Sequence, residues 1–111
     1  MAKSRVLRVL FLKEGTGQGW VAQGLEFDLA AQGDSIGEAV QNFQEVFEAQ
    51  VALDKHKGQE PLAGKKEAPS WYWRALEEAK PLRDPIVLQL PRYAWLSFFG
   101  FRTTSAQAWV R

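Results

Sequence analysis

The most constraining feature of the sequence is a helical repeat of apolar residues that starts after residue 35. These residues recur three or four positions apart, which places them on one face of an α-helix. The start of the helix is also encoded, because Ser35 and Glu38 have the spacing of a capping box. Gly58 supplies a stop. We therefore predict a long amphipathic helix that buries Ile36, Ala39, Val40, Phe43, Val46, Phe47 and Val51.

Three short strands are expected before this helix. Residues 5–12 are rich in β-branched and apolar side chains and lead into a glycine-rich turn at residues 15–19. Residues 20–23 supply the return strand, and residues 27–33 supply a third strand. Because the turn joins two strands, we interpret its glycines as hairpin geometry and not as a phosphate-binding loop. Residues 1–57 thus predict a β-β-β-α core.

The second half of the chain predicts an excursion followed by one more strand. Residues 58–91 are rich in Pro, Gly, Lys and Glu, and Pro69 favours the start of a short helix over residues 71–79. Residues 92–104 contain an aromatic run that predicts the final strand. A right-handed crossover would place this strand parallel to the first, at an edge of the sheet. We expect one α+β domain over residues 1–111, of order β-β-β-α-β with a short extra helix before the last strand.

The predicted final strand is apolar on both of its faces. An edge strand of this kind invites aggregation, because it lacks the charges and prolines that normally protect an edge. Antiparallel pairing with a second copy would bury both faces and satisfy the free backbone groups. We therefore predict a homodimer whose interface includes Trp95, Leu96, Phe98, Phe99 and Phe101.

The composition limits the classes of function. Fourteen Lys and Arg nearly balance thirteen Asp and Glu, so the net charge of +1 supplies no general field for binding nucleic acid. A hydrophobic fraction of 46% in 111 residues suits a single globular domain. No apolar run approaches the roughly 20 residues that span a bilayer. Because the chain has no cysteine, it lacks the disulfides of small secreted scaffolds, and we expect a cytoplasmic location.

Few residues are suited to catalysis. His56 is the only histidine and cysteine is missing, so we do not expect a Ser-His-Asp triad, a Cys-His pair or a zinc site within one chain. We interpret His56 as an exposed residue at the end of the long helix. Glu26 and Asp28 can share a strand face, but we interpret Asp34 as a helix cap, so no two-metal cluster is completed. The sequence predicts no enzyme, no cofactor and no metal site.

The most unusual local feature is the run Trp71, Tyr72, Trp73 and Arg74 in the predicted short helix. One interpretation is packing, in which the aromatic rings fasten the excursion to the core. The other is an exposed recognition patch, because aromatic residues beside arginine are typical of protein interfaces and of platforms that stack nucleic-acid bases. The sequence leaves both interpretations open.

Residues 19–39 resemble the HicB-like antitoxin family. Three linked pieces carry the resemblance: Gly-Trp-Val-Ala at residues 19–22, Leu-Glu-Phe-Asp at residues 25–28, and Gln-Gly-Asp-Ser-Ile-Gly-Glu-Ala at residues 32–39. The likeness extends over about residues 5–55. Gly37 departs from the pattern, since the family usually has an acidic residue at this position in the first helical turn.

The resemblance implies a β-β-β-α-β fold similar to a truncated RNase H without its catalytic acids. It also implies a non-catalytic protein-binding role, the neutralisation of a small HicA-like ribonuclease toxin. Many members add a helix-turn-helix or ribbon-helix-helix that binds operator DNA, but the ten residues after Phe101 are too few for either, so DNA binding is not expected. The alternative function is binding of RNA or single-stranded nucleic acid through residues 71–74.

Overall fold

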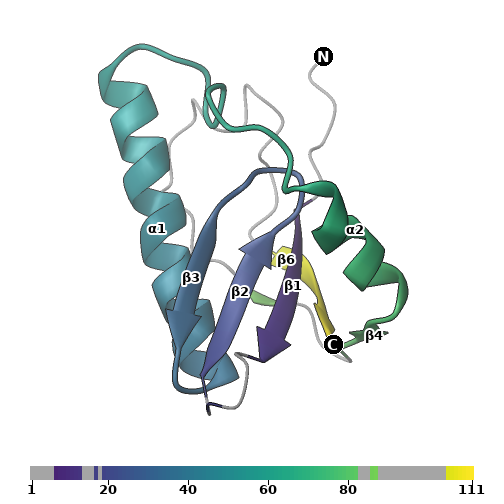
Figure 1. Ribbon diagram of the computed structural model, residues 1–111. Helices are drawn as coiled ribbons and strands as arrows, with labels where there is room; N and C mark the ends of the chain where they lie inside the picture. Colours follow the sequence, from purple (N-terminus) through teal and green to yellow (C-terminus); the bar gives the residue numbers. More distant parts are fainter. Residues whose placement is uncertain (1–6, 14–16, 18, 83–85, 88–104) are drawn as a thin grey trace.

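The computed structural model describes residues 7–13, 17, 19–82, 86–87 and 105–111 (Figure 1). These residues form a single α+β arrangement of two helices and six strands. The elements follow the chain in the order β1 (Arg8–Lys13), β2 (Trp20–Gly24), β3 (Ala30–Gly33), α1 (Ile36–His56), α2 (Ser70–Glu77), β4 (Lys80–Pro81), β5 (Ile86–Val87) and β6 (Ser105–Val110).

The strands form a mixed sheet with β1 near its centre. The order across the sheet is β3-β2-β1-β6-β4, and β5 also pairs with β6. β1 pairs with β2, and β2 with β3, in antiparallel fashion. β6 runs parallel to β1, with Arg8 opposite Gln107 and Phe11 opposite Val110. The predicted antiparallel β1-β2-β3 unit and the parallel strand beside β1 are therefore confirmed.

The parallel strand lies later in the chain than the sequence predicted. It is formed by Ser105–Val110, whereas residues 92–104, which were predicted to supply it, lie outside the described residues. β-propensity favours aromatic runs, but it does not measure the fit of a strand to its neighbours. In β6, Ala108 lies opposite Val9 and is buried in the core under α1, where a small side chain leaves room for the helix.

The outer side of β6 is covered by the segment that precedes it. β4 pairs antiparallel with Trp109 and Val110, β5 pairs antiparallel with the start of β6, and the backbone N–H of Leu82 donates to the carbonyl of Ala108 at 2.8 Å. The prediction that the strand beside β1 is an unpaired edge is therefore wrong. The residues predicted for a dimer interface lie outside the described residues: Trp95, Leu96, Phe98, Phe99 and Phe101.

Helix α1 begins and ends where the sequence signals predicted. The hydroxyl oxygen of Ser35, the N-cap, accepts a hydrogen bond from the backbone N–H of Glu38 at 3.1 Å. Gly58 follows the helix with a φ of +68°, in the left-handed region that glycine adopts without a steric penalty.

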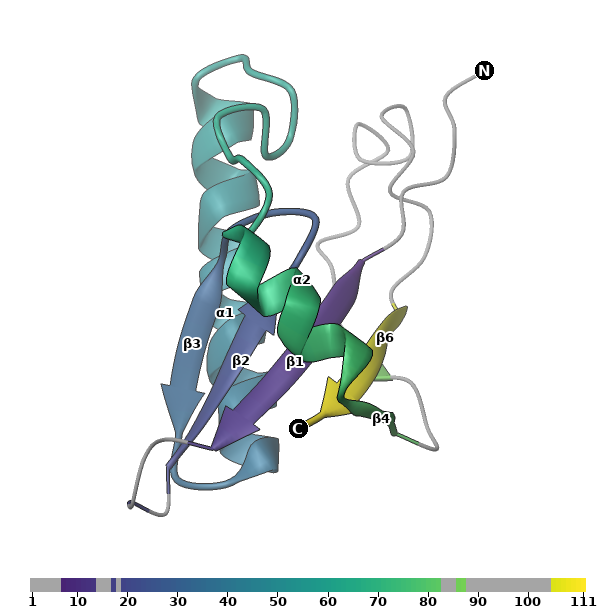
Figure 2. The ribbon, with the colours of Figure 1, turned by 45° about the vertical axis from the view of Figure 1, so that its right-hand side comes forward.

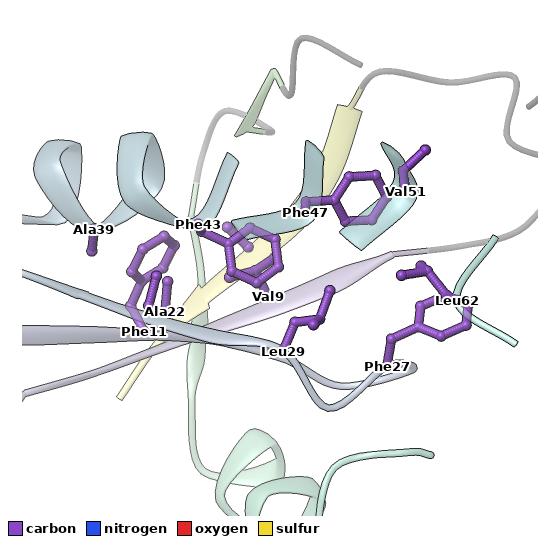
Figure 3. Close-up of a cluster of buried hydrophobic side chains, with 12 residues drawn as sticks. Val9, Phe11, Ala22, Phe27, Leu29, Ala39, Phe43, Phe47, Val51 and Leu62 are labelled. Carbon is purple, nitrogen blue, oxygen red and sulfur yellow. The ribbon is translucent and has the colours of Figure 1, made fainter. Parts of the chain in front are cut away.

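The main core lies between α1 and one face of the sheet (Figure 3). Both helix phenylalanines that the repeat predicted to be buried, Phe43 and Phe47, are fully enclosed. Val46 was also predicted to be buried, but it is 38% exposed, because it lies on the flank of the helix and not on the face that meets the sheet. The buried members of this cluster are Val9, Phe11, Ala22, Phe27, Leu29, Ala31, Ala39, Phe43, Phe47, Val51, Leu62 and Ala108.

The end of β3 touches the first turn of α1 at Gly33. A Cβ atom at this position would lie 2.4 Å from the backbone nitrogen of Ala39 and 2.7 Å from the carbonyl carbon of Glu38. Both are backbone atoms, so no side-chain rotation could make room. Glycine at position 33 is therefore what lets the strand and the helix approach this closely.

Helix α2 packs on the opposite face of the sheet (Figure 2). Side chains alternate along a strand, so Val9 and Phe11 of β1 face α1, whereas Leu10 and Leu12 face α2. A second cluster forms there from the buried residues Leu10, Leu25, Ala68 and Ala75, together with the partly buried Leu12, Tyr72, Trp73, Leu76, Ala79 and Trp109.

A buried carboxylate in α1 holds the segment that follows this helix in place through hydrogen bonds. Asp54 is only 3% exposed, and its side chain accepts hydrogen bonds from the backbone N–H of Leu62 at 2.7 Å and from the side-chain amide of Gln50 at 3.0 Å. Leu62 has a positive φ of 63° and a fully buried side chain. The Asp54 hydrogen bond thus holds Leu62 in an unfavourable backbone conformation that delivers its side chain to the core.

Candidate protein-binding surface

The aromatic motif of α2 is divided between packing and exposure. Trp71 is 48% exposed and Arg74 is also exposed, whereas Tyr72 and Trp73 are partly buried against the sheet. Four consecutive residues of a helix point about 100° apart, so they cannot all face the same way. The structure therefore combines the two interpretations that the sequence left open.

The exposed ring of Trp71 is held by its neighbour. The rings of Trp71 and Tyr72 are stacked, with centroids 3.6 Å apart and planes inclined by 29°. Because Tyr72 packs on the second core cluster, this contact restricts the motion of Trp71. A large aromatic side chain that is exposed and already ordered loses little entropy on binding, which is typical of anchor residues in protein interfaces.

Trp73 covers an ion pair on the face of the sheet. The guanidinium carbon of Arg8 lies 4.8 Å from the centroid of the Trp73 ring. Glu26 accepts from both the backbone N–H of Arg8 at 2.7 Å and its side-chain Nε at 2.6 Å. The positive charge of Arg8 is therefore compensated by Glu26.

The Arg8–Glu26 pair was not predicted from the sequence, although the sequence contained a signal for it. A hairpin that turns at residues 15–19 brings the start of β1 opposite the residues that follow β2. The backbone N–H of Leu25 does donate to the carbonyl of Arg8 at 3.0 Å. From this register, the opposite charges of Arg8 and Glu26 could have been predicted to pair.

Two of the three carboxylates that were considered for a metal cluster have separate structural roles. Glu26 binds Arg8, and Asp28 accepts a hydrogen bond from the side-chain amide of Gln23 at 2.8 Å. Asp34 was interpreted as a helix cap, but the N-cap is Ser35, because its hydroxyl reaches the N–H of Glu38.

Two kinds of feature are missing from the part of the chain that the structure describes. No group of three or more His, Asp or Glu side chains is placed to hold a metal ion. Neither α1 nor α2 has the combination of length and apolar character that crossing a membrane requires. His56 is exposed in the last turn of α1, as the sequence predicted.

The fold defines the class of protein as a mixed-sheet α+β domain with one helix on each face of the sheet. Comparisons of the chain with protein-family models, with curated proteins and with solved structures found no match.

Proposed function

We propose that the chain is a non-catalytic protein-binding module of the HicB-like type, whose partner is a HicA-like ribonuclease toxin. The chain neutralises the toxin by covering part of its surface, and it catalyses no reaction itself. The proposal places this role in the cytoplasm, where such a toxin would meet its RNA substrates.

The observation that carries the proposal is the topology. An antiparallel β1-β2-β3 unit is followed by the long helix α1, and β6 returns parallel to β1. This is the β-β-β-α-β order that the sequence resemblance implies. The three motif pieces that carry the resemblance also lie together, since they form β2, the turn between β2 and β3, and the junction of β3 with α1.

The exposed part of the aromatic motif supports a protein partner. Trp71 is a large, ordered and half-exposed ring beside the exposed Arg74, and these two residue types are enriched at the energetic centres of protein interfaces.

The decisive experiment is co-expression of the chain with the product of a small, basic reading frame adjacent to its own gene. We expect the neighbouring product alone to arrest growth and degrade RNA, and the pair to grow normally and to co-purify. Trp71→Ala should weaken the complex, whereas Lys57→Ala, an exposed change just after α1, serves as the matched control. Persistent growth arrest in the presence of the folded chain would refute the proposal.

The alternative function, binding of RNA or single-stranded nucleic acid, is favoured by one observation. Trp71 exposes a ring that could stack on a base, and Arg74 is exposed beside it. The test is fluorescence anisotropy with a labelled twelve-nucleotide RNA at several salt concentrations. Salt-dependent binding that Trp71→Ala abolishes would support this function over the antitoxin role.

A further inference from the structure

Helix α1 carries a second row of regularly spaced residues, besides the face that meets the sheet. Val46, Ala49, Leu53 and His56 follow one another at intervals of three, four and three residues, and all four are exposed. This alternation is the spacing of the contact positions in a coiled coil of two helices. We call these four residues the outer seam.

The outer seam gathers exposed apolar side chains on one line. Val46 is 38% exposed and Leu53 is 44% exposed, and they are two of the three large apolar residues that the described part of the chain exposes. They lie seven residues apart, which is about two turns, so one stands above the other on the helix. Ala49 lies between them, and its small side chain lets a neighbouring helix approach closely.

The outer seam points away from the main core. At about 100° per residue, it is centred about 120° around the helix from the buried Phe43 and Phe47. It lies on the side of α1 that is nearest β3, because the side-chain amide of Asn42, one turn before Val46, donates to the carbonyl of Gln32 at 2.7 Å. Figure 1 shows α1 and β3 together at one margin of the molecule. A helix that packs on the outer seam therefore lies beside α1 and outside the sheet.

The outer seam is complementary to itself in the antiparallel orientation. Leu53 is large and Ala49 is small, and the midpoint between them is at the level of Val51. A two-fold axis at that level sets Leu53 of each copy against Ala49 of the other.

The same axis also matches a polar pair. Glu45 and His56 are exposed and lie eleven residues apart, about three turns, so they share one shoulder of the outer seam. Their midpoint is also at the level of Val51, within half a residue. In an antiparallel two-fold pair each shoulder faces the same shoulder of the other copy, so Glu45 of each copy lies beside His56 of the other. An imidazole N–H donates to a carboxylate in this arrangement.

We propose that the chain associates with a second copy of itself through the outer seam, as an antiparallel pair of α1 helices around a two-fold axis. The apolar contact comes from Val46, Ala49 and Leu53, and a Glu45–His56 pair closes each end. A parallel pair would instead set Glu45 beside Glu45 of the other copy, where like charges repel.

The size of the contact indicates a reversible dimer. The stretch from Glu45 to His56 is about 16 Å long. One such stretch from each copy buries less than the roughly 1,200 Å² at which stable specific interfaces begin. We therefore expect a dimer that dissociates on dilution.

Self-association goes beyond the proposed function and does not rest on it. The outer seam belongs to α1, whereas Trp71 belongs to α2, and the two helices pack on opposite faces of the sheet. The dimer therefore leaves the exposed ring of Trp71 accessible to another protein.

The first test is sedimentation equilibrium of the full chain at concentrations up to about 0.5 mM, where weak dimers are populated. The wild type should shift from monomer to dimer as its concentration rises. Leu53→Glu places a charge in the contact and should weaken association about tenfold or more. Ser70→Glu is the matched control, because it adds the same charge at an exposed position of α2 and should change association less than about twofold.

Cross-linking tests the orientation, and it keeps the proposal testable if Leu53→Glu fails to fold. The chain has no cysteine, so a single introduced thiol is unique. In the antiparallel pair the two copies of residue 49 are offset by about 6 Å along the helices, whereas the two copies of residue 38 are offset by about 39 Å. A short bismaleimide should therefore join Ala49→Cys into a covalent dimer at least about tenfold faster than Glu38→Cys or Ser70→Cys.

A charge exchange tests the polar pair. Glu45→Lys and His56→Glu should each weaken association about threefold or more, and the double variant should restore it to within about twofold of the wild type. A wild type that stays monomeric at every concentration would overturn the proposal, as would a dimer that folded Leu53→Glu leaves unchanged. Equal cross-linking of Ala49→Cys and Glu38→Cys, or no restoration in the double variant, would also overturn the antiparallel pair.

Discussion

A pair of glycines four residues apart should respond in opposite directions to the same substitution. Gly33→Ala places a Cβ 2.4 Å from the nitrogen of Ala39 and 2.9 Å from its Cα, both of them backbone atoms of α1. An ordinary contact needs about 3.4 Å or more, so β3 and the first helical turn must separate by about 1 Å. Overpacking of this kind costs about 1–3 kcal/mol, and the upper end applies because backbone cannot rotate away.

Gly37→Ala is the matched control. The nearest atom to a Cβ at this position is the hydroxyl oxygen of Ser35 at 3.9 Å, so nothing must move. Alanine is a better helix former than glycine, and the variant should gain about 0.5–1 kcal/mol in unfolding free energy. The two variants should thus differ by about 3 kcal/mol or more in total.

Urea denaturation followed by tryptophan fluorescence measures this difference. At unchanged m-value, Gly33→Ala should lower the midpoint by about 1–2 M, and Gly37→Ala should raise it slightly. Because the clash is with backbone, a second change of Ala39→Gly should not restore stability. An unchanged midpoint for Gly33→Ala, or rescue by Ala39→Gly, would refute the reasoning.

Substitutions in the core, at the carboxylate at the end of α1 and in the aromatic motif can be tested by the same denaturation assay. Phe47→Ala should lower the free energy of unfolding by about 3–5 kcal/mol, since the ring is fully enclosed. A loss below about 1 kcal/mol would contradict the assignment of Phe47 to the core. Asp54→Ala should lower the free energy of unfolding by about 1–3 kcal/mol, because it leaves the N–H of Leu62 without its hydrogen-bond acceptor. Asp54→Asn should lower it less, because the amide oxygen can still accept that bond. Trp71→Ala should change stability by no more than about 0.5 kcal/mol, whereas Trp73→Ala should cost about 2 kcal/mol or more, and equal effects would contradict the division of the motif.

Local sequence signals predicted the elements whose boundaries depend on local chemistry. The capping box of Ser35 and the left-handed Gly58 set the ends of α1, and both act within a few residues of the chain. The three antiparallel strands could be predicted for the same reason, because a hairpin turn joins two strands that are adjacent in the sequence.

The features that were missed depend on contacts between distant residues. The place of β6 is decided by its fit between β1 and the returning β4 and β5, which the β-propensity of residues 92–104 does not report. The division of the aromatic motif depends on where α2 meets the sheet. Asp54 did carry a signal, because it lies seven residues after Phe47 on the buried face, where an acidic residue needs a partner.

The parallel pairing of β1 with β6 also governs how the chain folds. Arg8 lies opposite Gln107, 99 residues later, so this pairing closes a very long loop and has a large sequence separation. The β1-β2-β3-α1 unit needs no such closure and can form first, which leaves the outer side of β1 exposed until β6 arrives. In native-state hydrogen exchange, the amides that join β6 to β1 should therefore open at lower free energy than those within β1-β2-β3, as a separate cooperative unit.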